Sequence, residues 1–378
     1  MGNCFIDMGK VNDFTTTYTA KLILFVMIFL LPNTLLAEEK KQVDPGPGVT
    51  LLIYHRFGDD RYPTTNVPTT RFKEQMAYLK DNDFQVIPLG QLVRSIKKQI
   101  PLPDKAVVIT VDDGYKSVYD VAWPILKSYG YPFTVFVYVK ATDKNYNDIM
   151  SWEDIMEMKA AGVDFQDHSY SHHRLGDWPK NMDEAQYRSW IHEDLSRGSR
   201  ILKERLGRKP DFLAIPYGEY NSIVLEEAVS IGYEAVFSQD PGSVSIDSDL
   251  MLIPREPILG NEWSGIEHFS KVLHRVDMPI YDLEPSLAAL SHPLVTRFGC
   301  RVKDMDSYVS GTLGIYVSGL GWKPAVVDGN HVYIDNDKPL ERHFSRVTVS
   351  GRLKDSGRLA MRTWMLIQRP EKEDVKAN

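Results

Sequence analysis

Apolar runs of strand length alternate with stretches of helical periodicity between residue 49 and about residue 276. The predicted strands are 49–54, 84–89, 106–111, 133–139, 163–165, 211–215 and 234–237. The predicted helices are 70–81, 116–129, 151–160, 183–206, 222–231 and 263–275. Repeated alternation of strand and helix is typical of a parallel sheet, so the pattern predicts an α/β domain over 49–276. A segment of this length favours a closed or nearly closed barrel.

The pattern changes after about residue 277, where helical periodicity fades and short strand-like runs follow one another. Turns such as Asp328-Gly329-Asn330 separate these runs, which are 295–302, 314–317, 332–334, 345–349 and 361–367. The pattern therefore predicts a small antiparallel β domain over 277–378. No motif decides whether this domain binds sugar, contacts a partner or covers the barrel, and covering the barrel is the default interpretation.

The N-terminal segment 1–37 has the pattern of a secretory signal peptide. Lys21 precedes an apolar stretch that ends at Ala37, and the polar segment 38–48, which contains proline and glycine, is expected to be a flexible linker. An uncleaved membrane anchor and a buried strand are the alternative interpretations. We therefore expect an exported protein, periplasmic, envelope-associated or secreted, that meets a membrane only through this segment.

Composition narrows the classes of partner. The chain has 378 residues, a formal net charge of −7 and no block rich in lysine and arginine, which argues against a nucleic-acid partner. Cys300 is the only cysteine beyond the predicted signal peptide. The mature protein is therefore expected to have no internal disulfide.

Two adjacent carboxylates, Asp112 and Asp113, follow the predicted strand 106–111 and precede Gly114. Parallel sheets and barrels place their active sites at the carboxyl ends of their strands. Asp-Asp-Gly is also a common turn sequence, so this pair alone does not distinguish a catalytic site from a turn.

The segment 168–173 reads His-Ser-Tyr-Ser-His-His and follows the predicted strand 163–165. His168 and His172 are four residues apart, so a helical turn would place their imidazoles on one face. Two histidines and one carboxylate leave open positions for water, as hydrolytic zinc requires, and the same ligands also suit iron(II). The pattern therefore predicts a metal site. His173 lies outside the four-residue spacing and is expected at the surface or behind the ligands.

A third strand end reads Ala214-Ile215-Pro216-Tyr217-Gly218. This turn could aim backbone N–H groups at the barrel mouth, and we assign Tyr217 and Gly218 to binding of the substrate or an oxyanion. Pro-Tyr-Gly is also a generic turn. The rings of Tyr217 and Trp152 either form a platform for a sugar or pack within the domain.

Taken together, these strand ends resemble the polysaccharide deacetylases with a NodB-type domain, carbohydrate esterase family 4. The resemblance covers about 49–276, and three segments match the family's motifs in order: Asp112-Asp113, His168-Ser169-Tyr170-Ser171-His172 and Pro216-Tyr217-Gly218. The pair Tyr54-His55 resembles the opening of the exported branch that acts on poly-N-acetylglucosamine and similar exopolysaccharides.

The resemblance implies an irregular (β/α)7 barrel with one divalent metal ion bound by Asp113, His168 and His172. Zinc is the expected ion, and cobalt, nickel or iron(II) are the alternatives. The implied function is metal-dependent removal of N-acetyl groups from amino sugars of a polysaccharide, with release of acetate. Asp112 is then the general base.

Two positions depart from the family pattern. The arginine that usually precedes the third-motif proline by two residues, and pairs with the catalytic aspartate, is replaced by Ala214. Arg255 either supplies this charge from a later loop or is an ordinary surface residue. The late histidine that supplies a general acid has only His274 as a counterpart, within a helical stretch. We prefer His55, which ends the first strand, as the acid, with a structural role as the alternative.

Two other functions stay open on the sequence. The two departures allow a non-catalytic carbohydrate-binding or scaffold protein on a degenerate deacetylase barrel. The presence of all four residues of the first two motifs argues against it, because a binding barrel does not need the full set. An O-acetyl esterase would use the same residues and is separated only by its substrate.

Overall fold

The structure is a computed structural model that describes residues 48–103 and 105–369. The predicted signal peptide or anchor, and nearly all of the predicted linker, lie outside these residues. No helix within the described ranges is both long and apolar enough to cross a membrane.

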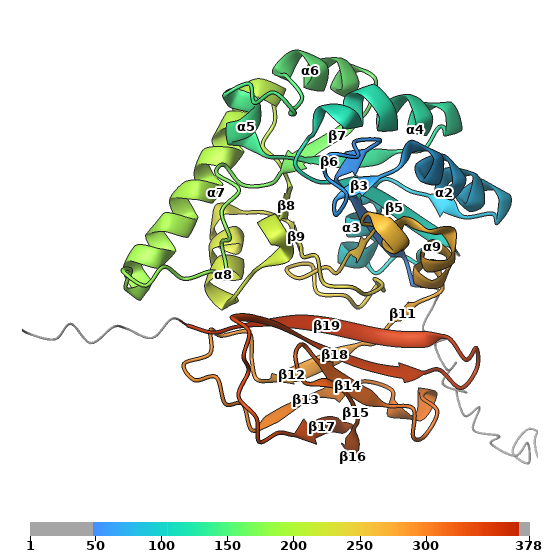
Figure 1. Ribbon diagram of the computed structural model, residues 1–378, viewed down its shortest axis with the longest axis vertical. Helices are drawn as coiled ribbons and strands as arrows, with labels where there is room; N and C mark the ends of the chain where they lie inside the picture. Colours follow the sequence, from blue (N-terminus) through green and yellow to red (C-terminus); the bar gives the residue numbers. More distant parts are fainter. Residues whose placement is uncertain (1–47, 104, 370–378) are drawn as a thin grey trace, which may run out of the picture. The chain divides into compact units, whose positions relative to one another are not determined.

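Parallel strands form the central sheet of the larger part of the chain (Figure 1). In sheet order they are β10 (Glu256–Pro257), β1 (Thr50–Tyr54), β5 (Ala106–Val111), β6 (Phe133–Val137), β7 (Asp164–Asp167), β8 (Phe212–Ala214) and β9 (Ala235–Phe237), with β4 (Gln85–Val86) beside β5. A parallel bridge from Phe237 to Ile253 brings the chain before β10 back to β9. The predicted irregular (β/α)7 barrel is therefore confirmed.

Helices surround this sheet, as Figure 1 shows. They are α2 (Thr69–Asp81), α3 (Leu89–Lys98), α4 (Trp123–Tyr129), α5 (Val139–Asp143), α6 (Trp152–Ala160), α7 (Glu184–Leu206), α8 (Ser222–Ile231) and α9 (Ile266–Leu273). Side chains on the outer face of the sheet pack against helices, and those on the inner face, such as Val108, Phe136 and Phe237, pack against one another, so every residue of β1, β5 and β6 is buried. Short pieces complete this part: β2 (Arg56–Phe57), β3 (Asn66–Val67), the π-helical turn η1 (Val118–Ala122), η2 (Pro216–Gly218) and η3 (Asn261–Ser264).

The predicted strand 84–89 is wrong in its second half. Only β4 is extended there, and α3 begins at Leu89, directly after Pro88. Leu89, Leu92 and Ile96 are buried on one face of α3, so the apolar residues after 86 belong to helical rather than strand periodicity. In the same way, α5 replaces the end of the predicted strand 133–139.

The C-terminal part contains two sheets, which confirms the predicted antiparallel β structure. The first has the order β11 (Val276–Asp277), β19 (Leu359–Ile367), β18 (Phe344–Arg352), β14 (Gly314–Val317) and β15 (Gly321–Pro324). The second has the order β12 (Ile280–Glu284), β13 (Arg297–Val302), β17 (His331–Asp335) and β16 (Val326–Asp328), and η4 (Met305–Ser307) lies in a connection. All pairs are antiparallel except β11 with β19. Buried side chains such as Phe298, Cys300 and Trp364 share one core.

The barrel and the C-terminal sheets share a buried core and are joined by hydrogen bonds. Met365 and Ile367 of β19 belong to the same buried cluster as Leu213 and Val224 of the barrel. The described residues form one compact unit, and the predicted boundary at residue 276 falls inside β11. A separate domain beginning at residue 277 therefore stays a prediction.

Candidate metal centre

The carboxyl ends of neighbouring strands bring the predicted site residues to one edge of the barrel. His55 follows β1, Asp112 and Asp113 follow β5, and His168 follows β7. The Tyr217 turn follows β8, which pairs with β7. Because all these strands are parallel, their carboxyl ends lie at the same edge, where such folds build their sites.

Three potential ligands converge there. One ligand atom each from Asp113, His168 and His172 lies within 4.8 Å of the other two, and no other such group occurs among the described residues. Asp113 Oδ1 is 2.9 Å from His172 Nε2 and 3.3 Å from His168 Nε2. Asp113 and His168 are buried and His172 is half-buried. The structure therefore brings together the three residues that the sequence singled out.

A backbone carbonyl fixes the orientation of the His168 ring. Its Nδ1 lies 2.7 Å from the carbonyl oxygen of Ala214. A carbonyl can only accept a hydrogen bond, so Nδ1 carries the proton and Nε2 keeps its lone pair toward Asp113. This is the arrangement of a metal-binding imidazole whose second nitrogen is held by the protein.

The route by which His168 and His172 converge differs from the prediction. Residues 168–173 form an irregular loop rather than a helical turn. Ser169 and His172 have φ angles of 62° and 55°, in the left-handed region, and the Ser169 hydroxyl accepts a hydrogen bond from the His172 N–H at 3.0 Å. Asp113 and Tyr217 are left-handed too, with φ of 71° and 59°. Non-glycine residues in this region cost on the order of 1 kcal/mol or more each, and such strain gathers at functional sites.

Asp112 is paired with Arg255. The guanidinium donates from Nη1 to Oδ1 at 2.7 Å and from Nη2 to Oδ2 at 2.8 Å, and both residues are fully buried. Arg255 is therefore not a surface residue, and it meets Asp112 from a later loop although Ala214 occupies the usual arginine position. Burial by itself raises the pKa of Asp112, but the charges of Arg255 and His168 outweigh it and hold that pKa below its ordinary value.

The remaining ionisable groups attract one another. Burial would raise the pKa of Asp113, yet the adjacent His168 and His172 hold it well below its usual range. Burial would lower the pKa of His168, but the carboxylates of Asp112 and Asp113 leave it raised. The Asp113 carboxylate is thus held ionised, as a metal ligand must be, and a bound cation would take the place of any proton shared between it and the two imidazoles.

Of the two candidate acids, His55 lies at the site and His274 does not. His55 is buried, and its pKa is lowered, chiefly by that burial, while Asp113 and Asp112 act in the opposite direction. Its Nδ1 has no hydrogen-bond partner among the described residues. His274 is exposed at the end of α9, where its Nδ1 lies 2.7 Å from the Ser270 carbonyl oxygen. His173 is exposed beside Trp190, 6.0 Å away between ring centroids.

Aromatic rings surround the potential ligands. Two of these rings, those of Tyr138 and Tyr115, were not predicted. The rings of Tyr217 and Tyr138 lie 4.7 and 5.0 Å from that of His172. Tyr115 lies beside Asp113, and its pKa is raised by burial and by that carboxylate. Tyr138 follows β6 and Tyr115 follows the Asp-Asp-Gly turn, so the strand-end rule could have found both. Trp152, in contrast, is buried in the barrel core and packs rather than facing substrate.

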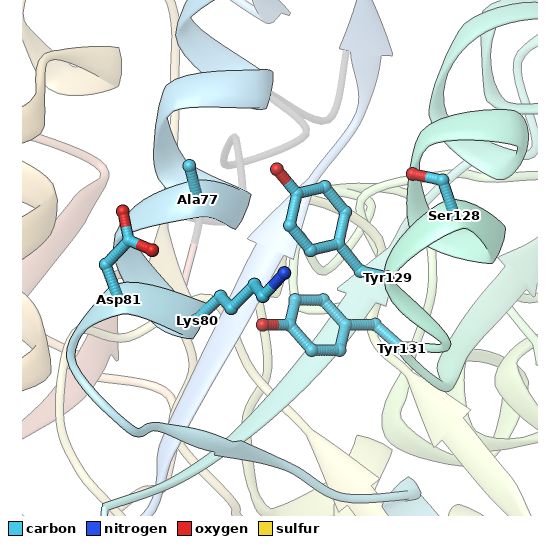
Figure 2. Close-up of a pocket in the computed structure, with 6 residues that line it drawn as sticks. All are labelled: Ala77, Lys80, Asp81, Ser128, Tyr129 and Tyr131. Atoms are coloured by element: carbon cyan, nitrogen blue, oxygen red, sulfur yellow. The ribbon is translucent and has the colours of Figure 1, made fainter.

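Figure 2 shows a hollow away from this site, between α2 and α4, with Lys80 extending toward Tyr129 and Tyr131. Asp81, which also lines it, precedes β4, and Tyr131 precedes β6. This hollow therefore lies near the amino ends of the strands, opposite the edge that carries Asp113. It contains none of the predicted site residues.

The barrel part of this chain is similar to known polysaccharide deacetylases. Residues 99–236 match the family model described as polysaccharide deacetylase. The chain is 27% identical over 267 residues to the poly-beta-1,6-N-acetyl-D-glucosamine N-deacetylase of Escherichia coli K12, over 61% of this chain and 39% of that protein. It is 25% identical over 289 residues to the Staphylococcus epidermidis protein of the same name, over 68% of this chain and 99% of that one. The chain thus spans about two-fifths of the Escherichia coli relative.

Two solved structures share the barrel. One is IcaB from Ammonifex degensii, with a TM-score of 0.52 and 27% identity over 60% of this chain and 97% of that one. The other is the Streptococcus pyogenes deacetylase PplD in complex with acetate, with a TM-score of 0.53 and 23% identity over 60% of this chain and 98% of that one. The second likeness shows the fold alone. Both matches leave the remaining two-fifths of the chain uncovered.

Proposed function

Because the barrel carries a polysaccharide deacetylase domain, we propose that this protein is a metal-dependent hydrolase that removes N-acetyl groups from amino sugars of a polysaccharide and releases acetate. One observation carries the proposal. A buried Asp-His-His ligand set stands directly beside a second aspartate that is held ionised by arginine. A protein that only binds sugar has no need of this combination.

The ligand set fits a divalent cation. Asp113 Oδ1 is buried without a hydrogen-bond partner among the described residues, although both Nε2 atoms approach it, so a cation would satisfy its lone pair. Two imidazoles and one carboxylate suit zinc, which we propose as the ion, with cobalt, nickel and iron(II) compatible with the same ligands. When bound, the ion supplies Lewis-acid chemistry that polarises the acetyl carbonyl and makes water nucleophilic at neutral pH.

Asp112 is proposed as the general base. Its two oxygens face Arg255, which keeps the carboxylate ionised and fixed, and Oδ2 lies 3.8 Å from His168 Nε2, at the edge of the ligand set. From there Asp112 takes a proton as water attacks the acetyl carbon. The two adjacent aspartates thus have different proposed roles: Asp113 would bind the cation, and Asp112 would accept and release the proton.

The turn after β8 is proposed to bind the oxyanion. Gly218 N–H already donates to the Ile215 carbonyl oxygen at 2.9 Å, so the Tyr217 N–H is the donor we assign. Gly218 allows the turn to form, because its φ is 65° and a Cβ at this position would lie 2.5 Å from Gln239 N. The Tyr217 ring is 40% exposed next to His172 and offers a face for a sugar ring.

His55 is proposed to protonate the departing amine. Its burial at the strand end and the proximity of Asp112 and Asp113 support this role. A lowered pKa makes its protonated form a strong donor, although that form is a minority at neutral pH. The result would be acetate and a glucosamine unit.

We further propose a substrate of the poly-N-acetylglucosamine kind and an exported location. The first rests on the relatives named as deacetylases of that polymer. The second rests on the signal-peptide pattern of 1–37, with the protein acting in the periplasm, on the envelope or outside the cell.

The test is acetate release by purified residues 38–378 from N-acetylglucosamine oligomers, after chelation and with zinc, cobalt or nickel restored. The proposal expects release that requires the metal. Release only from O-acetylated sugars would identify an esterase instead. Oligomer binding without release under any metal would identify a non-catalytic binding protein.

A further inference from the structure

The C-terminal sheet reaches toward the candidate site through one buried carboxylate, Asp240, which lies just after β9. Arg346 of β18 donates from Nε to Asp240 Oδ1 at 2.8 Å. The Tyr220 hydroxyl donates to Oδ2 at 2.7 Å and itself accepts the backbone N–H of Met365, in β19, at 3.1 Å. Asp240 and Tyr220 are each 1% exposed. Two neighbouring strands of the C-terminal sheet thus hold one barrel residue.

The turn 238–240 carries this connection to Arg255. The Asp240 carbonyl oxygen accepts the Arg255 N–H at 3.1 Å, and the Ser238 N–H donates to the Ile253 carbonyl at 2.9 Å. The Ser238 carbonyl oxygen accepts the Nε of Arg255 at 2.8 Å. Both the backbone and the guanidinium of Arg255 are therefore positioned by this turn, and the guanidinium in turn holds both oxygens of Asp112.

The same turn supports the proposed oxyanion donor. Gly218 packs so closely on the turn that an added Cβ would lie 2.5 Å from the backbone nitrogen of Gln239. Tyr217, whose N–H we assign to the oxyanion, immediately precedes Gly218. A displacement of 238–240 would therefore move two parts of the site together, the Arg255–Asp112 pair and the Tyr217 turn.

We propose that Asp240 is a positioning residue, which makes the C-terminal sheet part of the catalytic scaffold rather than a cover. The proposal rests on the proposed deacetylase function. Asp240 touches neither the ligands nor Asp112; it acts by anchoring the turn that aligns Arg255. Because catalytic groups must be held within fractions of an ångström, loosening this anchor lowers turnover without removing any reacting group.

The main test is Asp240→Asn, which keeps the shape and the tyrosine contact but loses the carboxylate's charge. We expect kcat to fall by about 10- to 100-fold, with KM and zinc affinity unchanged. The Arg346 side chain is half-exposed, and Arg346→Met should lower kcat in the same way, with KM and zinc affinity unchanged. Arg346→Lys, which keeps the positive charge, should partly restore activity. The loss should vanish in an Asp112→Asn background, because both changes act on one pair.

Asp277→Asn is the matched control. Asp277 is a buried carboxylate at the same interface, and it accepts hydrogen bonds from Arg362 of β19 at 3.4 Å and from the hydroxyls of Ser245 and Ser248 at 2.8 and 3.4 Å. Its carboxylate has no hydrogen bond to the described turn 238–240. We expect the control to keep wild-type kcat. Equal kcat losses in Asp240→Asn and Asp277→Asn, or none in the Asp240 and Arg346 variants of an active enzyme, would overturn the proposal.

Hydrogen exchange provides a readout that does not depend on turnover. The backbone amides of the segment 238–240, and the Arg255 amide that donates to it, should exchange faster in Asp240→Asn than in Asp277→Asn at equal global stability. Unchanged exchange in that segment would contradict the positioning role even if the wild-type protein released no acetate. An inactive wild type would instead contradict the proposed deacetylase function, so the two failures are distinguishable.

Discussion

The strand ends of the barrel and the C-terminal sheet are built in opposite ways. Strands β18 and β19 pair over nine residues each, and β18 alternates regularly between buried and half-buried side chains. At the barrel edge, by contrast, Asp113, Ser169, His172 and Tyr217 all adopt left-handed backbone, and charged groups are buried. Regular structure stabilises the chain in one region, and strained, polar structure concentrates the chemistry in the other. Asp240 is one of the residues through which the two regions are joined.

The largest effect is expected from Asp113→Ala, at the strand ends of the barrel. Removing the shared carboxylate leaves two imidazoles without their anionic partner, so zinc binding and acetate release should both be lost. Zinc content after dialysis and acetate release are the measurements. A variant that kept full zinc and full turnover would remove Asp113 from the ligand set.

Asp112→Asn should separate turnover from metal binding. The amide keeps the shape beside Arg255 but cannot accept a proton, so turnover should fall by about 10²- to 10⁴-fold. Zinc content should stay at the wild-type level, because the proposed ligands Asp113, His168 and His172 are intact. Loss of zinc together with activity would show that the two aspartates do not have separate roles.

A core substitution in the C-terminal sheet should act on stability instead. Trp364, 1% exposed, fills the core between the two C-terminal sheets, so Trp364→Ala should lower the free energy of unfolding by about 3–5 kcal/mol. Trp322→Ala, at a side chain 54% exposed in β15, is the control and should cost about 1 kcal/mol or less. Urea unfolding measures both, and equal costs would contradict the assigned core.

The smallest expected effect concerns Glu219, which contacts Arg174 at the rim of the site. Burial, reinforced by Asp177 and opposed by Arg174, raises the pKa of Glu219 to about 7 from an ordinary 4.5. A raised pKa means that the folded state binds the proton more tightly, so stability present at low pH is lost as the pH rises from about 4.5 to 7.

Glu219→Gln should remove that part of the pH dependence, which we expect to be on the order of 1 kcal/mol after solvent screening. Urea unfolding at pH 5 and pH 7 for both proteins measures it, and subtraction isolates this carboxyl from other titrating groups. If the free energy of unfolding changed by the same amount between pH 5 and pH 7 in the two proteins, Glu219 would have an ordinary pKa.

The sequence predicts those features that depend on local pattern. Buried strands such as 106–111 are continuous apolar runs, so the α/β fold class follows from the pattern, whereas the choice of Asp113, His168 and His172 as one ligand set came from the resemblance to the deacetylase family. Strands β12, β15 and β16 escaped prediction because they are short and none of their residues is buried, so they lack the alternation of buried and exposed positions.

Long-range contacts and left-handed backbone conformations could not be predicted from the sequence. Arg255 lies 143 residues from its partner Asp112, so only the folded chain distinguishes it from a surface arginine. The loop 168–172 brings its histidines together through left-handed residues rather than the helical turn that the spacing suggested. Asp240 carries no motif at all, and its connection to β18 and β19 is visible only in three dimensions.

The most direct test of the central claim is a zinc titration of the chelated wild-type protein, followed by the rate of acetate release from N-acetylglucosamine oligomers. A single ligand set of Asp113, His168 and His172 predicts a rate that rises in proportion to zinc and levels off at one equivalent per chain. A rate that is already full without zinc, or no release at any zinc concentration, would contradict the account.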